Sequence, residues 1–222
     1  MKKTMLAAAL AAFIAVSCNN EKTSGESTRK SEGATDTSAS TISSEKKAWV
    51  PVDSATAMKA YMETAIPGEQ HKLLASTAGK WTGDATMWME KGSAPTTSKI
   101  NMDNKMIMDG RYQLSTSSGD MGGMPFMGSG TIGYDNYKKK FFSTWIDNMG
   151  TGIIMMEGTH DPATNAITYT GTYPNPANGS MCEIKQVYHI TDADHAVMEM
   201  WGPDMKTGEE YKTVEIKLTR NK

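Results

Sequence analysis

The chain has 222 residues, with 23 lysines and arginines against 25 aspartates and glutamates, so its formal net charge is -2. This balance excludes a nucleic-acid binder that works through a basic surface, and eight prolines and two cysteines exclude collagen-like and disulfide-scaffold proteins. The length suits one globular domain, and the unusual feature of the composition is its 19 methionines.

Residues 1–17 are predicted to be a signal peptide. Lys2 and Lys3 precede an apolar run over residues 5–16, which is shorter than the ~20 helical residues that span a bilayer. Small residues stand directly before Cys18, and this arrangement resembles the bacterial lipoprotein box. The resemblance implies that Cys18 becomes the acylated first residue of the mature chain and anchors it to a lipid bilayer. The alternative is an ordinary signal peptide with an incidental cysteine.

Residues 18–48 are predicted to be a tether. Apart from Ile42 they contain no large apolar residue, so they cannot bury enough surface to offset the entropy of ordering. With the lipid anchor, this predicts a domain held in the cell envelope on a flexible spacer. The residue after Cys18 is asparagine, and by resemblance to other lipoproteins this favours the outer membrane.

Residues 49–78 form a short helical lead-in. Asp53 or Ser54 is placed to cap a helix that runs to Ala65. A second helix is expected from Pro67 onward, and Gly79 is expected to end it.

From Gly79 onward the apolar pattern changes to a period of two, which is typical of β-strands. The predicted strands lie near residues 80–90, 98–108, 110–118, 128–135, 139–147, 151–159, 166–173, 181–191, 195–202 and 210–219. Short turns join them without helices between, so the pattern predicts an all-β, up-and-down antiparallel meander over residues 79–222. Closure into a barrel would remove exposed edges and could enclose one small ligand. A two-sheet sandwich is the competing architecture.

Gly79 and Trp81 stand at the start of the first strand, and Arg220 stands at the end of the last. This pairing resembles the lipocalin and wider calycin superfamily, in which a Gly-x-Trp motif closes the barrel floor and a late arginine stacks over the tryptophan. The contact implied is a cation–π interaction that ties the two ends of the barrel together.

A longer set of motifs, in one order over about 150 residues, resembles a bacterial lipocalin-like family of domains without a settled function. The motifs are His71 with Leu74, Gly79-Lys80-Trp81, Gly110-Arg111-Tyr112, Pro125-Phe126-x-Gly128, Gly133-Tyr134-Asp135, Ser143-Thr144-Trp145-x-Asp147 and Glu157-Gly158-x-x-Asp161. The resemblance implies the barrel fold but supplies no catalytic residues.

Five residues are candidates for ligand binding: Arg111, Tyr112, Trp145, Asp147 and Glu157. Trp145 and Asp147 are two apart and share one face of a strand. If Arg111 points inward, Asp147 or Glu157 is its natural counter-charge, and the pair would form a polar end to an apolar cavity. The alternatives are a structural ion pair or charges that face solvent.

Met121, Met124 and Met127 lie in a glycine-rich segment, residues 119–128, that is expected to be a flexible loop over the barrel mouth. Regularly spaced thioethers resemble the methionine motifs of periplasmic copper proteins, and soft sulfur selects Cu(I). The segment has no histidine or cysteine to complete a site. The alternative to a copper site is therefore a loop over the barrel mouth whose methionines serve as apolar anchors.

Other cofactors are weakly supported. The four histidines, His71, His160, His189 and His195, form no zinc-binding spacing, although His189 and His195 could approach across a hairpin. Barrels of the calycin group that bind haem carry a histidine in the final strand, which is absent here. Enzyme signatures such as G-x-S-x-G and phosphate loops are also absent, so no catalytic residue is predicted.

The leading hypothesis is therefore a lipid-anchored barrel that binds a small, mostly apolar ligand without catalysis. An envelope interaction protein with a solid barrel is the alternative, and a cavity of ~300 Å³ is the lower bound that separates the two. Cys182, the only other cysteine, is predicted to be buried in a strand as a small apolar residue.

Overall fold

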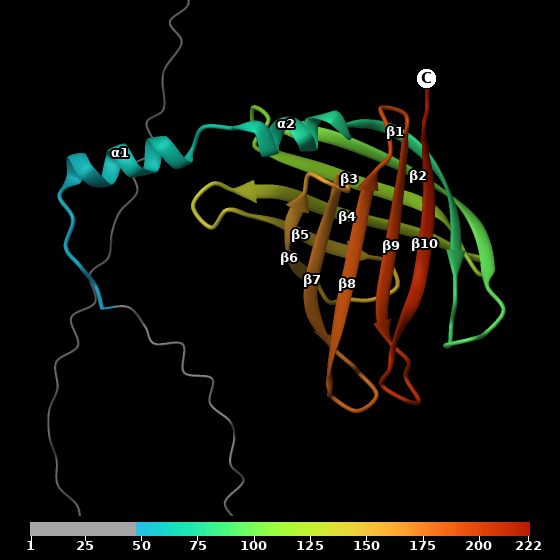
Figure 1. Cartoon of the computed structure of the whole chain (residues 1–222). Coiled ribbons are helices and arrows are strands. Elements are labelled where there is room, and N and C mark those ends of the chain that lie inside the picture. The colour runs from blue at the N-terminus through green and yellow to red at the C-terminus, as the bar shows by residue number, and fades with distance from the viewer. Residues whose placement is uncertain (1–47) are drawn as a thin grey trace, which may run out of the picture. The chain divides into compact units, whose positions relative to one another are not determined.

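The computed structural model describes residues 48–222 (Figure 1). The predicted signal peptide, Cys18 and residues 18–47 of the tether lie outside the described residues. Residues 50–222 form one compact unit.

Two helices precede the sheet. Helix α1 (Ser54–Thr64) begins at the predicted cap, because a carboxylate oxygen of Asp53 accepts hydrogen bonds from the backbone N–H groups of Ala55 and Thr56 at 3.0 Å. Every residue of α1 is at least partly exposed. Helix α2 (Glu69–Ser76) buries His71 and Leu74. Within residues 48–222 no helix is both long enough and apolar enough to cross a membrane.

Helix α2 ends earlier than the sequence indicates. Its C-cap is Thr77, and Gly79 is the first residue of β1, with a φ of +122°. A Cβ built at Gly79 would lie 2.8 Å from Nη1 of Arg220. The glycine is therefore needed for the entrance into the barrel and for the close approach of Arg220.

All ten predicted strands are present, each within a few residues of its expected place. They are β1 (Gly79–Met87), β2 (Thr96–Ile107), β3 (Tyr112–Met121), β4 (Met124–Asp135), β5 (Lys140–Asp147), β6 (Ile154–Asp161), β7 (Ala166–Pro174), β8 (Met181–Ile190), β9 (His195–Pro203) and β10 (Glu210–Arg220).

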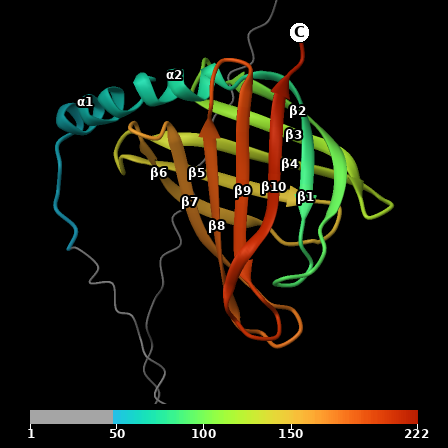
Figure 2. The ribbon, with the colours of Figure 1, turned by 45° about the vertical axis from the view of Figure 1, so that its right-hand side comes forward.

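The strands close into an antiparallel barrel in the order β1-β10-β9-β8-β7-β6-β5-β4-β3-β2. Each strand pairs with its neighbours along the chain, and β1 pairs with β10 over seven residues. Closure excludes the sandwich alternative. Strands β8–β10 cross the direction of β3–β5 steeply (Figure 2), as expected of strands that tilt about a barrel axis.

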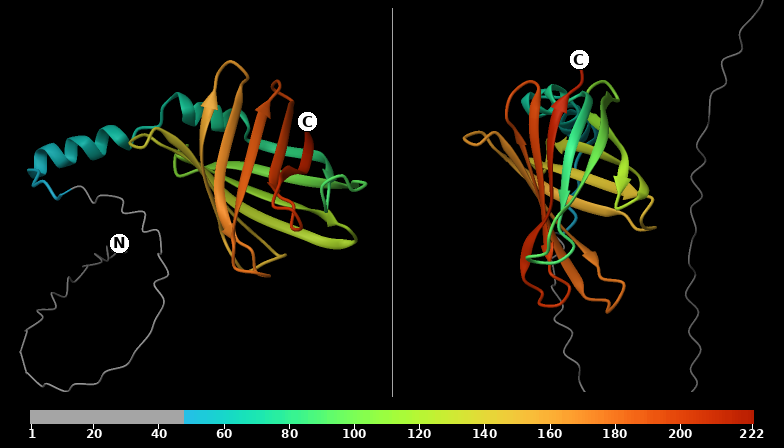
Figure 3. Two further views of the ribbon diagram at one scale, coloured as in Figure 1. Left: turned by 60° about the horizontal axis from the view of Figure 1, so that its bottom comes forward. Right: turned by 90° about the vertical axis from the view of Figure 1, so that its right-hand side faces the viewer.

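The two ends of the barrel differ. Helix α2 lies at the end where β1 begins and β10 finishes, which we call the floor (Figures 1 and 2). The β7–β8 and β9–β10 hairpin turns lie at the opposite end (Figure 3). The β3–β4 turn and the β5–β6 loop share that opposite end by strand direction, and we call it the mouth.

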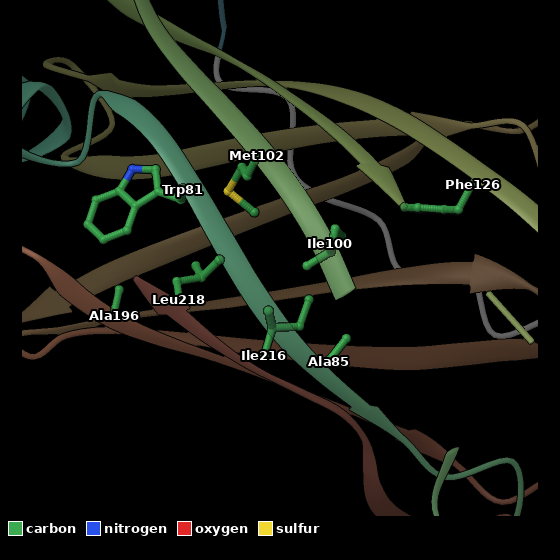
Figure 4. Packing of buried hydrophobic residues seen from close by; sticks show 8 residues of the cluster. All are labelled: Trp81, Ala85, Ile100, Met102, Phe126, Ala196, Ile216 and Leu218. Atoms are coloured by element: carbon green, nitrogen blue, oxygen red, sulfur yellow. The ribbon is translucent and has the colours of Figure 1, made fainter. Parts of the chain in front are cut away.

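A buried apolar cluster surrounds β1. Its members are Trp81, Ala85, Ile100, Met102, Phe126, Ala196, Ile216 and Leu218. Figure 4 shows Phe126 set apart from the others, on β4 near the mouth. A second cluster, which includes Leu74, Phe141 and Tyr169, joins α2 to β5–β8.

The predicted floor contact is confirmed. The guanidinium of Arg220 lies 4.1 Å from the ring centroid of Trp81, which is 1% exposed. The same guanidinium donates to the backbone oxygens of Ser76 (2.7 Å), Ala78 and Ala193 (2.7 Å). One side chain thus fastens β10 to β1, to the end of α2 and to the β8–β9 turn.

Arg220→Lys should lower the free energy of unfolding by at least about 2 kcal/mol, because an ammonium group cannot reproduce the forked donation to three carbonyls. Arg111→Lys is the matched control, since Arg111 lies in the β2–β3 turn with its side chain 39% exposed. Its cost should stay within about 0.5 kcal/mol. Urea denaturation of both variants measures the difference, and equal losses would refute the role given to Arg220.

Candidate functional site

The barrel encloses a cavity of about 330 Å³. Leu74 and Thr77 of the α2 region lie at its floor end, and Phe126, Asp147 and Met149 lie at its mouth end. Most of the remaining lining is aliphatic, aromatic or methionine side chains. The volume is above the ~300 Å³ at which small-molecule pockets begin.

The mouth wall contains a tryptophan held in a fixed orientation. Nε1 of Trp145 donates to a carboxylate oxygen of Asp147 at 2.8 Å. The indole stacks on Phe126, with 6.4 Å between ring centroids and 21° between planes. A Cβ on Gly128 would collide with this indole. The sequence correctly places Trp145 and Asp147 on one face, and both line the cavity.

Polar side chains line one side of the deeper cavity. Gln113, Ser115 and Ser117 alternate along β3 and are all buried. Nε2 of Gln113 donates to the backbone oxygen of Leu74 at 2.7 Å. Asn104, opposite Ser115 on β2, donates from Nδ2 to the backbone oxygen of Thr77 at 3.2 Å.

Three lining side chains carry a buried polar atom without a hydrogen-bond partner in the part of the chain described, residues 48–222. They are Oδ1 of Asn104, Oγ of Ser117 and the hydroxyl oxygen of Tyr188. Asn104 is 4% exposed and Ser117 5%. Because Nδ2 of Asn104 is used by the Thr77 carbonyl, its Oδ1 is left as an acceptor.

Burial raises the pKa of Tyr188 to about 12, an effect that the charge of Arg220 partly opposes. The phenol therefore keeps its proton throughout the physiological range. Tyr188 lies on β8, five strands from β3 in either direction around the ring. Its hydroxyl and that of Ser117 thus come from opposite walls of the cavity.

Arg111 does not point inward, so the conditional ion pair with Asp147 or Glu157 is not formed, and the alternative of charges that face solvent is confirmed. Arg111 lies in the β2–β3 turn, where Nη1 donates to the backbone oxygen of Met108 at 3.2 Å. That turn is at the floor end, whereas Asp147 is at the mouth. Glu157 faces outward and pairs with Lys138 at 3.1 Å and Lys140 at 3.0 Å. The hydrogen bonds from these two lysines lower the pKa of Glu157, and the bond from Lys140 has the larger effect.

Tyr112 also lies outside the cavity. It packs against Phe142 with 6.1 Å between ring centroids, on the face of β3 opposite to Gln113. Alternation along β3 is the reason: Gln113 is buried inside, so its neighbour must point out. Of the five ligand-binding candidates, the structure therefore brings only Trp145 and Asp147 to the cavity.

The methionine segment is a hairpin and not a flexible loop. Strand β3 runs to Met121 and β4 begins at Met124, with two glycines of positive φ between them. Met121 and Met124 are directly paired and share a face. Met127 is three residues further along and points to the opposite face, where it is exposed. The hairpin therefore does not bring the three thioethers together.

The histidines and Cys182 have local structural partners. His71 accepts at Nδ1 from the backbone N–H of Gly68 at 3.0 Å, and burial lowers its pKa. His195 pairs with Asp192 at 2.9 Å. Over residues 48–222 no cluster of three His, Cys, Asp or Glu side chains is placed to hold a metal. Cys182 is buried on β8, as the sequence predicts.

The sequence interpretation missed the deep polar residues, of which Asn104, Gln113, Ser117 and Tyr188 are the main ones. A usable signal was present on β3, because Gln113, Ser115 and Ser117 alternate and must share one face. Nothing in the sequence indicates whether that face is the inner one, since serine is as common outside a barrel as inside.

Gly128→Ala should displace the Trp145 indole from Asp147, because the new methyl group occupies the position of the indole. We expect a red shift of tryptophan fluorescence and a loss of about 1–3 kcal/mol in the free energy of unfolding. Gly150→Ala is the matched control, since a Cβ there meets nothing within 4 Å. If Gly128→Ala matches the control in both measurements, the described packing of Trp145 is incorrect.

Comparisons with known proteins agree with this fold. No curated protein matches the sequence. The crystal structure of Rv2717c from M. tuberculosis has a TM-score of 0.53 at 13% identity, and the alignment covers 71% of this chain and 100% of that one. The S-type phycobiliprotein lyase CPES from Guillardia theta has a TM-score of 0.53 at 8% identity, with coverage of 73% and 97%. Such identities establish similarity of fold alone.

A family model described as "Protein of unknown function (DUF1579)" matches residues 66–220. This span contains α2, all ten strands and the complete lining of the cavity. The chain therefore belongs to the DUF1579 family.

Proposed function

We propose that the protein binds a small, mostly apolar ligand inside the barrel, without catalysis. The observation that carries this proposal is the cavity of about 330 Å³, which is lined mainly by apolar side chains. Three of its lining side chains carry a polar atom that has no partner within residues 48–222. Pockets of this kind, apolar with a few convergent polar groups, are typical of small-molecule sites.

A solid barrel would serve only as a scaffold or an interaction surface. The cavity volume of about 330 Å³ favours the hollow alternative, because well-packed interiors hold few voids larger than a water molecule. One protein of similar fold is named as a phycobiliprotein lyase, so the fold is compatible with ligand binding. The identity of the ligand is not carried over from that protein.

A neutral naphthylamine dye should bind the full chain, purified without detergent, with an increase in its fluorescence. Ser115→Phe places a ring in the cavity. Because the ring occupies space that the dye needs, dye binding should weaken at least about tenfold. Thr116→Phe is the matched control, because Thr116 is the exposed neighbour on the same strand. Equal affinity of the two variants would place the dye outside the barrel and count against the proposal.

We propose further that the domain is held at a membrane through an acylated Cys18. The support is the sequence alone: basic residues, an apolar run over residues 5–16 and small residues before the cysteine. Acyl chains on that residue would supply the anchor, with the polar segment up to residue 48 as a spacer.

Cys18→Ala should abolish incorporation of labelled fatty acid and move the protein from the detergent phase to the aqueous phase in a detergent phase-separation assay. Cys182→Ala is the control, since Cys182 is buried in the barrel and should leave both results unchanged. Incorporation of label into the Cys18→Ala protein would exclude this anchor.

A further inference from the structure

We propose that the cavity selects a ligand that carries a hydroxyl group and no negative charge, and that it discriminates against carboxylates. This inference rests on the proposed ligand-binding function and specifies its chemical class. It is carried by two observations: the charges along the cavity wall, and the three polar atoms that have no partner in residues 48–222.

The cavity wall offers no positive charge. In the described region, residues 48–222, the lining side chains include no lysine, arginine or histidine. Arg111 is in the β2–β3 turn with its side chain 39% exposed, and Arg220 donates to backbone oxygens at the floor. The charge of Arg220 acts on Tyr188 from the floor, but this guanidinium already donates to three backbone oxygens. A carboxylate placed deep in the cavity would therefore be buried without a counter-charge in direct contact, which is unfavourable.

The opposite orientation, with the head group at the mouth, is also unfavourable for an anion. Asp120 and Asp147 line the mouth end. Only Asp147 turns its carboxylate inward, because Asp120 alternates with the buried residues of β3 and accepts the backbone N–H of Gly123. An anionic head group at the mouth would meet the like charge of Asp147. An anionic amphiphile is therefore disfavoured in both orientations, whereas an uncharged one is not.

The deep polar atoms define the group that an uncharged ligand must present. Oδ1 of Asn104 can only accept, so the ligand must donate to it. The hydroxyls of Ser117 and Tyr188 can each donate or accept. A ligand hydroxyl also donates and accepts, so it can pair with any one of the three atoms, and that contact is one that the ligand-free protein lacks within residues 48–222.

A matched series tests this proposal: decanol, decanoate and decylamine, titrated at neutral pH into the full chain and measured by calorimetry. Decanol should bind at least about tenfold more tightly than decanoate, since one well-placed hydrogen bond changes affinity by about that factor. Decylamine should bind with its ammonium at the acidic mouth. Decanoate that binds as tightly as decanol would overturn the proposal.

At least one of the variants Ser117→Ala and Tyr188→Phe should weaken decanol binding about tenfold, and neither should change decylamine binding. Because each substitution removes a buried polar atom that has no partner among residues 48–222, the melting temperature of the ligand-free protein should stay the same or rise. A merely structural role predicts the reverse, a lower melting temperature.

The matched controls are Ser118→Ala and Tyr112→Phe, which make the same chemical changes on the outer face of β3. Both variants should bind all three probes like the unmodified chain. If decanol binding withstands both Ser117→Ala and Tyr188→Phe, the assigned contacts are wrong. If none of the probes binds and the naphthylamine dye also fails, the proposed function itself is wrong. If the dye binds but the series shows no selectivity, the inference about the ligand class is wrong and the proposed ligand-binding function stands.

Discussion

The barrel depends on how the carbonyl groups at the end of α2 are satisfied. The last carbonyls of a helix have no partner within it, and here the barrel supplies donors. Arg220 bonds the oxygens of Ser76 and Ala78, and Trp81 bonds that of Thr77 at 3.0 Å. Without these donors the helix could not close the floor, and without the helix the core would be open to water at that end.

The floor and the cavity are built from the same side chains. Gln113 and Asn104 direct their N–H groups to the Leu74 and Thr77 carbonyls, which fixes the orientation of both amides. Fixing Asn104 in this way leaves its oxygen buried and without a partner within residues 48–222. The closure of the floor thus determines which hydrogen-bonding atom the cavity presents, so that one structural constraint sets part of the chemistry of the site.

Much of the fold follows from the sequence, because period-two alternation between turn residues is a local pattern. The ten strands were predicted in this way, whereas the Trp81–Arg220 contact was predicted from the resemblance to the calycin superfamily. The direction of an isolated charged side chain does not follow from a local pattern. Arg111 lies in the β2–β3 turn, outside the strands, and Glu157 faces solvent because its neighbours Met156 and Gly158 are the residues of β6 that point inward. The methionine segment was misread because two adjacent glycines fit a tight hairpin turn as well as a flexible loop.

The contrast between the floor of the cavity and the wall above it indicates that the deep polar atoms serve a ligand. At the floor, buried side-chain donors are matched to helix carbonyls. A few residues higher, the protein leaves Ser117 and Tyr188 hydroxyls unpartnered within residues 48–222, although each such group costs about 1–3 kcal/mol when buried. Alanine and phenylalanine would avoid that cost without changing the fold. A protein with a net stability of about 5–15 kcal/mol would gain from those replacements unless the hydroxyls meet a partner that enters from outside.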